Sequence, residues 1–145
     1  MANPLTPQGN LNKLSASVIY ALFPQLNVTP SFLGSEMINL SFEGEATHII
    51  ETATGTVQSP QPYQMINLTL HLLRTQGLAQ LYKLQFETTT FVGDLIVYPD
   101  VTTLSPYPLI NCALTNVRPL TINGTDAGYM VSVRGYYLVN LGLWL

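Results

Sequence analysis

The stretch YQMINLTLHLL, residues 63–73, alternates between apolar and polar side chains over most of its length. Successive side chains of a β-strand point to opposite faces of a sheet, so this period of two predicts a strand with one packed face and one face in water. A second layer must cover the packed face. The apolar positions are Ile66, Leu68, Leu70 and Leu72, and the polar positions are Asn67, Thr69 and His71.

The stretch MINLSFE, residues 37–43, shows the same alternation and predicts a second half-buried strand. Gly44 and Glu45 follow it and predict a turn into a strand at residues 47–52. Other runs rich in β-branched and aromatic residues predict strands at 17–23, 91–97, 109–117 and 128–141.

Asn123-Gly124 is a strong signal for a tight turn between two strands. The arms of this hairpin are expected at residues 118–122 and 129–133.

One segment has helical spacing. Residues 76–87 place Leu78, Leu81, Tyr82 and Leu84 on one stripe, and Thr75 stands where an N-cap is expected. The stripe is expected to pack on the open face of a sheet. Together the elements predict one domain over residues 1–145 that is mainly β: a β-barrel or sandwich of two packed antiparallel sheets with one flanking α-helix.

Residues 53–63 lack apolar periodicity and predict an extended hairpin tip or loop that stands off the domain. Loops of this length carry function often enough to make the segment a candidate interaction site. Its members are Ala53, Thr54, Gly55, Thr56, Val57, Gln58, Ser59, Pro60, Gln61, Pro62 and Tyr63.

Charge is scarce. The 145 residues include 5 Lys or Arg and 8 Asp or Glu, or 9% charged, against 47% hydrophobic. A soluble domain has roughly a quarter of its residues charged. We therefore expect large parts of the surface to be buried against other copies of the chain. The formal charge of −3 and the scattered cations argue against tight nucleic-acid binding.

The residues that catalysis needs are few. The chain has two histidines, His48 and His71, and one cysteine, Cys112. Neighbouring Glu43 and Glu45 are expected to form a solvated acidic edge. Because the sequence contains no phosphate-binding loop, nucleophile elbow or helix-borne metal motif, we expect no enzyme activity, no cofactor and no metal.

The two ends of the sequence differ in character. Residues 1–12 are rich in Pro, Gly and Asn and predict an extended arm, and the first residues do not resemble a secretory signal. We expect synthesis and folding in the cytoplasm and no membrane insertion. Residues 141–145 form an apolar tail that is expected to make a contact, with Leu143, Trp144 and Leu145 as its candidate residues.

The order of these elements resembles the tail tube proteins of tailed bacteriophages and, more distantly, the tube proteins of type VI secretion. The resemblance covers residues 11–140 and rests on element order and composition. It is carried by the stretches MINLSFEGE (37–45), TGTVQSPQPY (54–63), LLRTQGLAQLY (72–82) and FVGDLIVY (91–98).

This resemblance implies hexameric rings that stack into a hollow tube, in which one sheet of each subunit joins its neighbours to line the lumen. The protein would lie in the virion tail, and DNA would pass through without specific binding. Sheath, tape-measure and baseplate proteins are candidate partners. Residues 53–63 would reach an adjacent subunit or ring, and the helix would lie outside, near a neighbour.

The strand alternation predicts which side chains face the lumen of such a tube. In a free monomer the same side chains would simply face solvent. A basic group in the lumen would hold passing phosphates unless an acid paired with it, and Glu43 is the expected partner of Arg134. The candidates are Asn39, Ser41, Glu43, Asn67, Thr69, Ser132 and Arg134.

Three alternatives remain open at the level of sequence. A baseplate or tail-completion protein would share the fold and stop after a single ring. A small-molecule-binding β-barrel belongs to another class, and a secreted adhesin-like subunit is disfavoured by the missing signal. Size in solution separates these classes, because a carrier is a monomer or dimer whereas a tube subunit forms larger species as its concentration rises.

Overall fold

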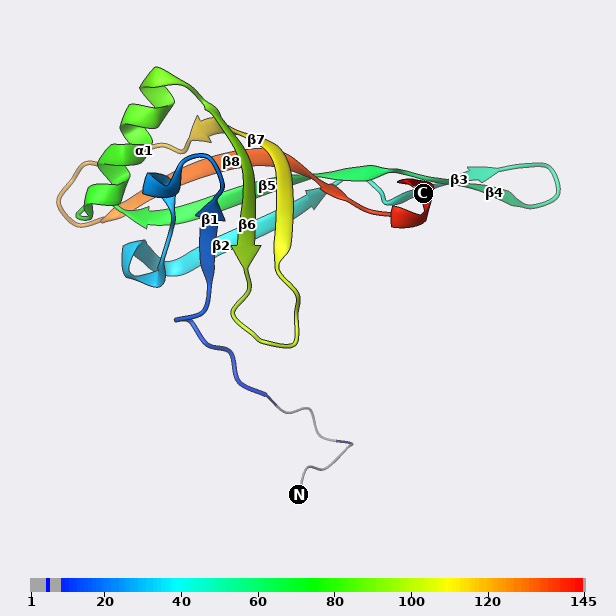
Figure 1. Ribbon diagram of the computed structural model, residues 1–145, viewed down its shortest axis with the longest axis horizontal. Helices are drawn as coiled ribbons and strands as arrows, with labels where there is room; N and C mark the ends of the chain where they lie inside the picture. Colours follow the sequence, from blue (N-terminus) through cyan, green and yellow to red (C-terminus); the bar gives the residue numbers. More distant parts are fainter. Residues whose placement is uncertain (1–4, 6–8, 145) are drawn as a thin grey trace.

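The computed structural model describes Leu5 and residues 9–144, and it is built mainly of β-strands (Figure 1). The order of elements is β1 (Ser17–Tyr20), β2 (Leu33–Glu43), β3 (Thr47–Glu51), β4 (Thr56–Pro60), β5 (Tyr63–Leu73), α1 (Gly77–Thr88), β6 (Phe91–Tyr98), β7 (Tyr107–Val117) and β8 (Gly128–Leu138). Three short 3₁₀ helices complete it: η1 (Pro24–Leu26), η2 (Pro30–Phe32) and η3 (Leu141–Trp144).

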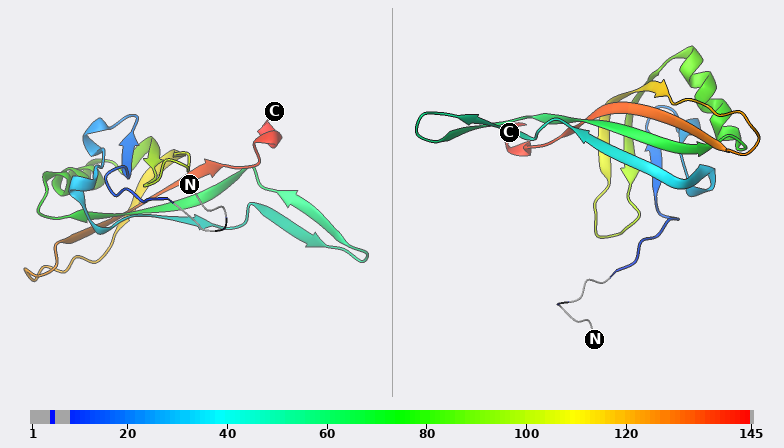
Figure 2. Two further views of the ribbon diagram at one scale, coloured as in Figure 1. Left: turned by 90° about the horizontal axis from the view of Figure 1, so that it is seen from below. Right: turned by 180° about the vertical axis from the view of Figure 1, so that it is seen from behind.

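Six strands form one antiparallel sheet in the order β1-β6-β7-β8-β5-β2. The sheet curls, so that β1, β6, β7 and the helix α1 lie on one side of the layer made by β2, β5 and β8 (Figure 2). The prediction of a mainly β, barrel-like fold with one helix is confirmed. The two packed layers are halves of one curled sheet, and the second sheet is the small hairpin β3–β4.

The curl coincides with irregular pairing between β6 and β7. The register shifts on both sides of Gly93, whose φ is +75°, and Asn111 in β7 has a φ of +55°. Such bulges bend a strand and increase its twist. The positive φ strains any residue with a Cβ, and an added Cβ would also come to 2.7 Å from Leu22 Cδ1, so glycine is favoured at this corner.

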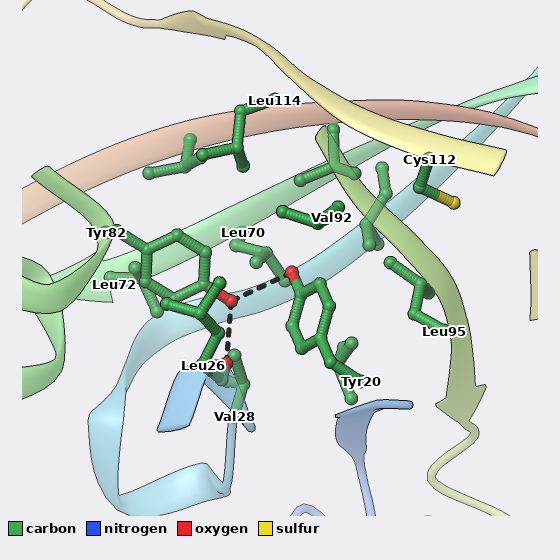
Figure 3. Packing of buried hydrophobic residues seen from close by; sticks show 14 of the residues in the cluster. Tyr20, Leu26, Val28, Leu70, Leu72, Tyr82, Val92, Leu95, Cys112 and Leu114 are labelled. Carbon is green, nitrogen blue, oxygen red and sulfur yellow. Dashed lines mark hydrogen bonds between the residues drawn. The ribbon is translucent and has the colours of Figure 1, made fainter. Parts of the chain in front are cut away.

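The core fills the space between the two halves of the sheet, where leucines of β5 pack together with Val92 and Leu95 of β6 (Figure 3). Within it lies a pair of buried phenols. The Tyr82 oxygen is 2.9 Å from both the Tyr20 hydroxyl and the Leu26 carbonyl oxygen. The Tyr82 hydroxyl is the donor toward both oxygens, so its single proton is shared between the Leu26 carbonyl and the Tyr20 hydroxyl. Burial raises the pKa of both phenols well above the usual value, which keeps them neutral.

The helix differs from its prediction in two ways. It begins at Gly77, and its N-cap is Gln76, which makes no side-chain capping bond, so the prediction of Thr75 as the cap is wrong. The buried residues are Leu78, Ala79, Tyr82 and Gln85, whereas Leu81 and Leu84 are 38% and 48% exposed. The anchored Tyr82 ring sets this rotation, and the buried Gln85 amide is satisfied by donating to the Thr89 carbonyl.

Other differences concern the ends of strands. The strand predicted at 17–23 ends at Tyr20, and the one predicted at 128–141 ends at Leu138. Residues 118–122 form no strand, so the predicted hairpin around Asn123-Gly124 is wrong. The two edges of β8 are already occupied by β5 and β7, which leaves no free edge for another arm.

The buried phenols give a test of the core. Tyr82→Phe would leave the Leu26 carbonyl and the Tyr20 hydroxyl without a partner, so we expect it to lower the free energy of unfolding by about 1–3 kcal/mol. Tyr20→Phe removes one bond and leaves Tyr82 bonded to Leu26, so it should cost ~0.5–1.5 kcal/mol. Urea unfolding measures both, with Tyr98→Phe as a control outside the pair. Equal losses in the two variants would contradict the central position of Tyr82 between its two partners.

Candidate functional site

The hairpin β3–β4 projects away from the rest of the molecule (Figure 1). Its five pairs run from Thr47 opposite Pro60 to Glu51 opposite Thr56. Thr52 closes the turn, because its backbone N–H and its hydroxyl both donate to the Gly55 carbonyl at 2.8 Å. The prediction of a hairpin standing off the domain agrees with this arrangement.

Two details of that prediction need correction. Residues 53–63 are not mainly loop, since Thr56–Pro60 form β4 and Tyr63 is the first residue of β5. Gly44, with a φ of +77°, does not fold β3 back onto β2; β3 pairs with β4 instead.

The hairpin exposes apolar side chains on both of its faces. Ile50 and Val57 are paired across one face and are 44% and 53% exposed, and Ile49 on the other face is 47% exposed. An isolated two-stranded hairpin is at best marginally stable in water. Exposed apolar surface on such an element makes the hairpin a candidate interaction site.

The C-terminal segment fastens the base of this hairpin. The Asn140 side-chain amide donates to the carbonyls of Ala46 and Gln61, at 3.0 and 2.8 Å, and so joins the two ends of the hairpin. The Trp144 indole N–H donates to the Pro62 carbonyl at 3.0 Å. We call residues 140–144 the C-terminal clasp.

The candidate tail contacts lie on this clasp. Leu143 and Trp144 are 53% and 56% exposed, so the indole is held by its own chain while much of its surface remains accessible. Leu145 lies outside the described residues, as do residues 1–4 and 6–8 of the predicted N-terminal arm.

The structure brings the candidate lumen residues together on one face of the β2–β5–β8 layer. Partners in an antiparallel register share a face. Asn39, Thr69 and Ser132 form one row across the three strands, and Ser41, Asn67 and Arg134 form the next. Glu43 follows two residues beyond Ser41 on β2. We call these seven residues the polar face.

Glu43 and Arg134 pair on the polar face, as expected. Their side chains approach to 2.5 Å between Glu43 Oε2 and Arg134 Nη2, with 39% and 47% of each side chain exposed. A pair this exposed stabilises the fold by only ~0.2–1 kcal/mol. Its main effect is to neutralise the one basic group of the polar face.

Two members of the polar face are less exposed than predicted. Thr69 is 8% and Ser132 is 3% exposed, and the Ser132 hydroxyl has no hydrogen-bond partner among the described residues. Both lie on strands that are paired on both sides, Thr69 on β5 beside the larger Asn67 and Ser132 on β8 beside the larger Arg134. These larger neighbours cover Thr69 and Ser132 and so reduce their exposure to solvent.

Two features of the surface were missed by sequence reasoning. His71 contacts Glu36, with 2.9 Å between Nδ1 and Oε2, because a bulge at Met37 shifts the register of β2. On the outer side of β1 and β6, Ile19 and Ile96 are paired and exposed, and Leu22 and Phe91 are also exposed. We call these four side chains the apolar face. Alternation in β1 and β6 pointed to it only weakly, because Ser17 and Asp94 interrupt the apolar residues on the outer side.

The described residues contain no group of three or more His, Cys, Asp or Glu side chains placed to hold a metal ion. The Cys112 thiol is buried, and this burial raises its pKa to about 12, so the thiol is protonated at neutral pH and is a poor nucleophile. Within the same residues, no helix is both long enough and apolar enough to cross a membrane.

No protein-family model matches the chain, and no curated protein matches it.

The C-terminal clasp can be tested without any partner. Asn140→Ala removes two hydrogen bonds at the base of the hairpin, so we expect hydrogen exchange of the β3 and β4 amides to rise about tenfold, as a loss of ~1.4 kcal/mol implies. Exchange in β5 and β8 should not change. Asn116→Ala, an exposed site on β7, is the matched control. Unchanged exchange in the hairpin of Asn140→Ala would show that the clasp does not hold it.

Proposed function

We propose that this protein is a structural subunit that assembles into hexameric rings, which stack into the hollow tail tube of a bacteriophage and conduct DNA into the host. The observation that carries the proposal is the division of its surface. One face is polar and nearly neutral, whereas the hairpin and the outer side of β1 and β6 expose apolar side chains. In a tube wall, the polar face would contact water in the lumen, and the apolar side chains would be buried against neighbouring copies.

The polar face suits the wall of a DNA conduit. Five of its seven side chains are uncharged, and the remaining two, Glu43 and Arg134, pair with each other. A free arginine there would gain affinity for phosphates by releasing counterions, and DNA would stick. Hydroxyl and amide groups with a compensated ion pair allow a polyanion to pass.

The edges of the sheet support assembly from copies. β2 is an edge strand of 11 residues, and among the described residues no strand pairs with its outer edge. Edge strands of this length promote pairing with another chain unless they are covered. Pairing of β2 with a neighbouring copy would extend the β2–β5–β8 layer around a ring and keep the polar face on one side.

The hairpin supports contact beyond a single subunit. It holds its apolar side chains away from the body, and the clasp fixes its base. In this proposal the hairpin reaches an adjacent subunit or ring, and α1, with Leu81 and Leu84 exposed, lies on the outside near a neighbour. The clasp residues Leu143 and Trp144 add to this contact.

The proposal places the protein in the virion tail, assembled in the host cytoplasm, with sheath, tape-measure and baseplate proteins as further partners and no cofactor. A baseplate or tail-completion protein with the same fold would stop at one ring. A small-molecule carrier is disfavoured because the space between the halves of the sheet is filled by side chains such as Tyr82, Leu70 and Leu95 that are 1% exposed or less.

Assembly is the first test. Concentrated wild-type protein should form hollow filaments or six-fold rings in negative-stain electron microscopy. Ile50→Asp should give a folded monomer, because an unpaired carboxylate buried at an interface costs several kcal/mol. Ile50→Val is the matched control and should assemble. A monodisperse wild-type monomer at high concentration, measured by sedimentation, would reject the proposal, and rings that never stack would favour the single-ring alternative.

A second test concerns the lumen. Glu43→Gln frees Arg134, so assembled tubes should retain duplex DNA at low salt, with the salt dependence of binding steeper by about one counterion per contacted phosphate. Glu45→Gln makes the same charge change on a side chain that contacts His48 and is the matched control. Glu43→Gln combined with Arg134→Gln should restore the wild-type behaviour. Equal DNA retention by both single variants would place the polar face outside the lumen.

A further inference from the structure

The loop between β7 and β8 holds Asn123 in an unusual environment. The Asn123 side-chain oxygen Oδ1 accepts three hydrogen bonds: from the Thr125 backbone N–H at 2.9 Å, from the Thr125 hydroxyl at 2.8 Å and from the Asp126 backbone N–H at 3.2 Å. All three donors follow Asn123 in the chain. The side chain is therefore folded forward over its own following peptide bond, and its carbonyl is polarised.

The residue that follows is Gly124, with a φ of +79°. A Cβ built at this position would meet nothing within 4 Å, so the space around the peptide is open. Among the described residues, the Gly124 N–H donates no hydrogen bond and the Asn123 Nδ2 group has no partner. The nitrogen that would attack and the group that would leave are both accessible.

We propose that Asn123 is a site of spontaneous covalent modification. The backbone nitrogen of Gly124 loses its proton to solvent and attacks Asn123 Cγ. The new N–Cγ bond closes a five-membered ring as the Cγ–Nδ2 bond breaks and ammonia leaves with a proton. Water then adds to one of the two ring carbonyls and opens the succinimide to aspartate or isoaspartate. Atoms balance with water as the only co-reactant.

The three donors select this asparagine. Negative charge develops on Oδ1 when Cγ becomes tetrahedral, and donors already aimed at that atom stabilise the charge as an oxyanion hole does. Rapid attack also needs an unhindered backbone nitrogen after the asparagine. Asn123 is the only asparagine in the sequence that is followed by glycine, which has no side chain to crowd that nitrogen. Asn140, in contrast, is followed by leucine and uses its amide to hold the hairpin.

Modification would change the loop and its attachment. The product adds one negative charge, beside Asp126, to a chain of formal charge −3. Isoaspartate also inserts an extra carbon into the backbone and displaces the Thr125 and Asp126 amides. The loop is tied to Arg74, which donates from its backbone to Ala127 and from its side chain to Thr121. It lies at the end of the molecule opposite the hairpin (Figure 1).

Peptide mapping by mass spectrometry tests the proposal on the folded protein over time at neutral and mildly alkaline pH. The Asn123 peptide should gain the mass of exchanging NH₂ for OH at least about tenfold faster than the Asn116 peptide, a difference of ~1.4 kcal/mol in barrier. The rate should rise with pH, because the attacking nitrogen must lose a proton. An isoaspartate-specific methylation assay identifies the rearranged product.

Variants separate the contributions. Gly124→Ala should slow conversion about tenfold, because a methyl group crowds the attacking nitrogen. Thr125→Val removes one donor and should slow it about threefold, less than the ~10²-fold effect of a buried oxyanion donor, because this loop is in water. The urea-unfolded chain is the reference and should react more slowly than the folded one. Conversion of Asn123 at the Asn116 rate, or faster conversion in Thr125→Val or in urea, would overturn the proposal.

Discussion

The pairing of β5 with β8 holds eleven residues of each strand in a single register, from Tyr63 opposite Leu138 to Leu73 opposite Gly128. The other strands of the large sheet are positioned by this pair, because β2 pairs with β5, and β7 pairs with β8 and in turn with β6. A shift by one residue would turn Ile66, Leu68, Leu70 and Leu72 out of the core and turn Asn67, Thr69 and His71 in. The cost of burying those polar groups without partners makes the register unique.

Both sides of this pair are used. β2 joins β5 and carries Glu43 to within reach of Arg134, and β7 joins β8 and leads into β6 and β1, which curl over the core. The first pair of the register also fixes where the hairpin leaves the body. Because Tyr63 and Leu138 are opposite each other, the chain beyond β8 passes the hairpin base, and Asn140 can bond to Ala46 and Gln61. The polar face and the hairpin are thus two products of one strand pairing.

Much of the candidate site could be predicted because strand alternation is a local property. The period of two placed the polar residues of β2, β5 and β8 on one face, and it suggested that Glu43 would neutralise Arg134. Alternation could not give the burial of Thr69 and Ser132, which depends on the size of neighbours on other strands. Nor could it give the Glu36–His71 contact, which depends on a bulge in β2.

The sequence by itself determined the mainly β class, the position of the single α-helix and the projecting hairpin, because these follow from residue patterns within a few positions of each other. Only the tertiary structure decided which side of α1 is buried, since Tyr82 bonds to Leu26 and Tyr20 from distant parts of the chain. It also decided that Asn123-Gly124 lies in a loop, because β5 and β7 already occupy both edges of β8. The local sequence favours a strand or helix at a given position, but a strand forms only if a sheet edge is free to pair with it, and distant parts of the chain compete for that edge.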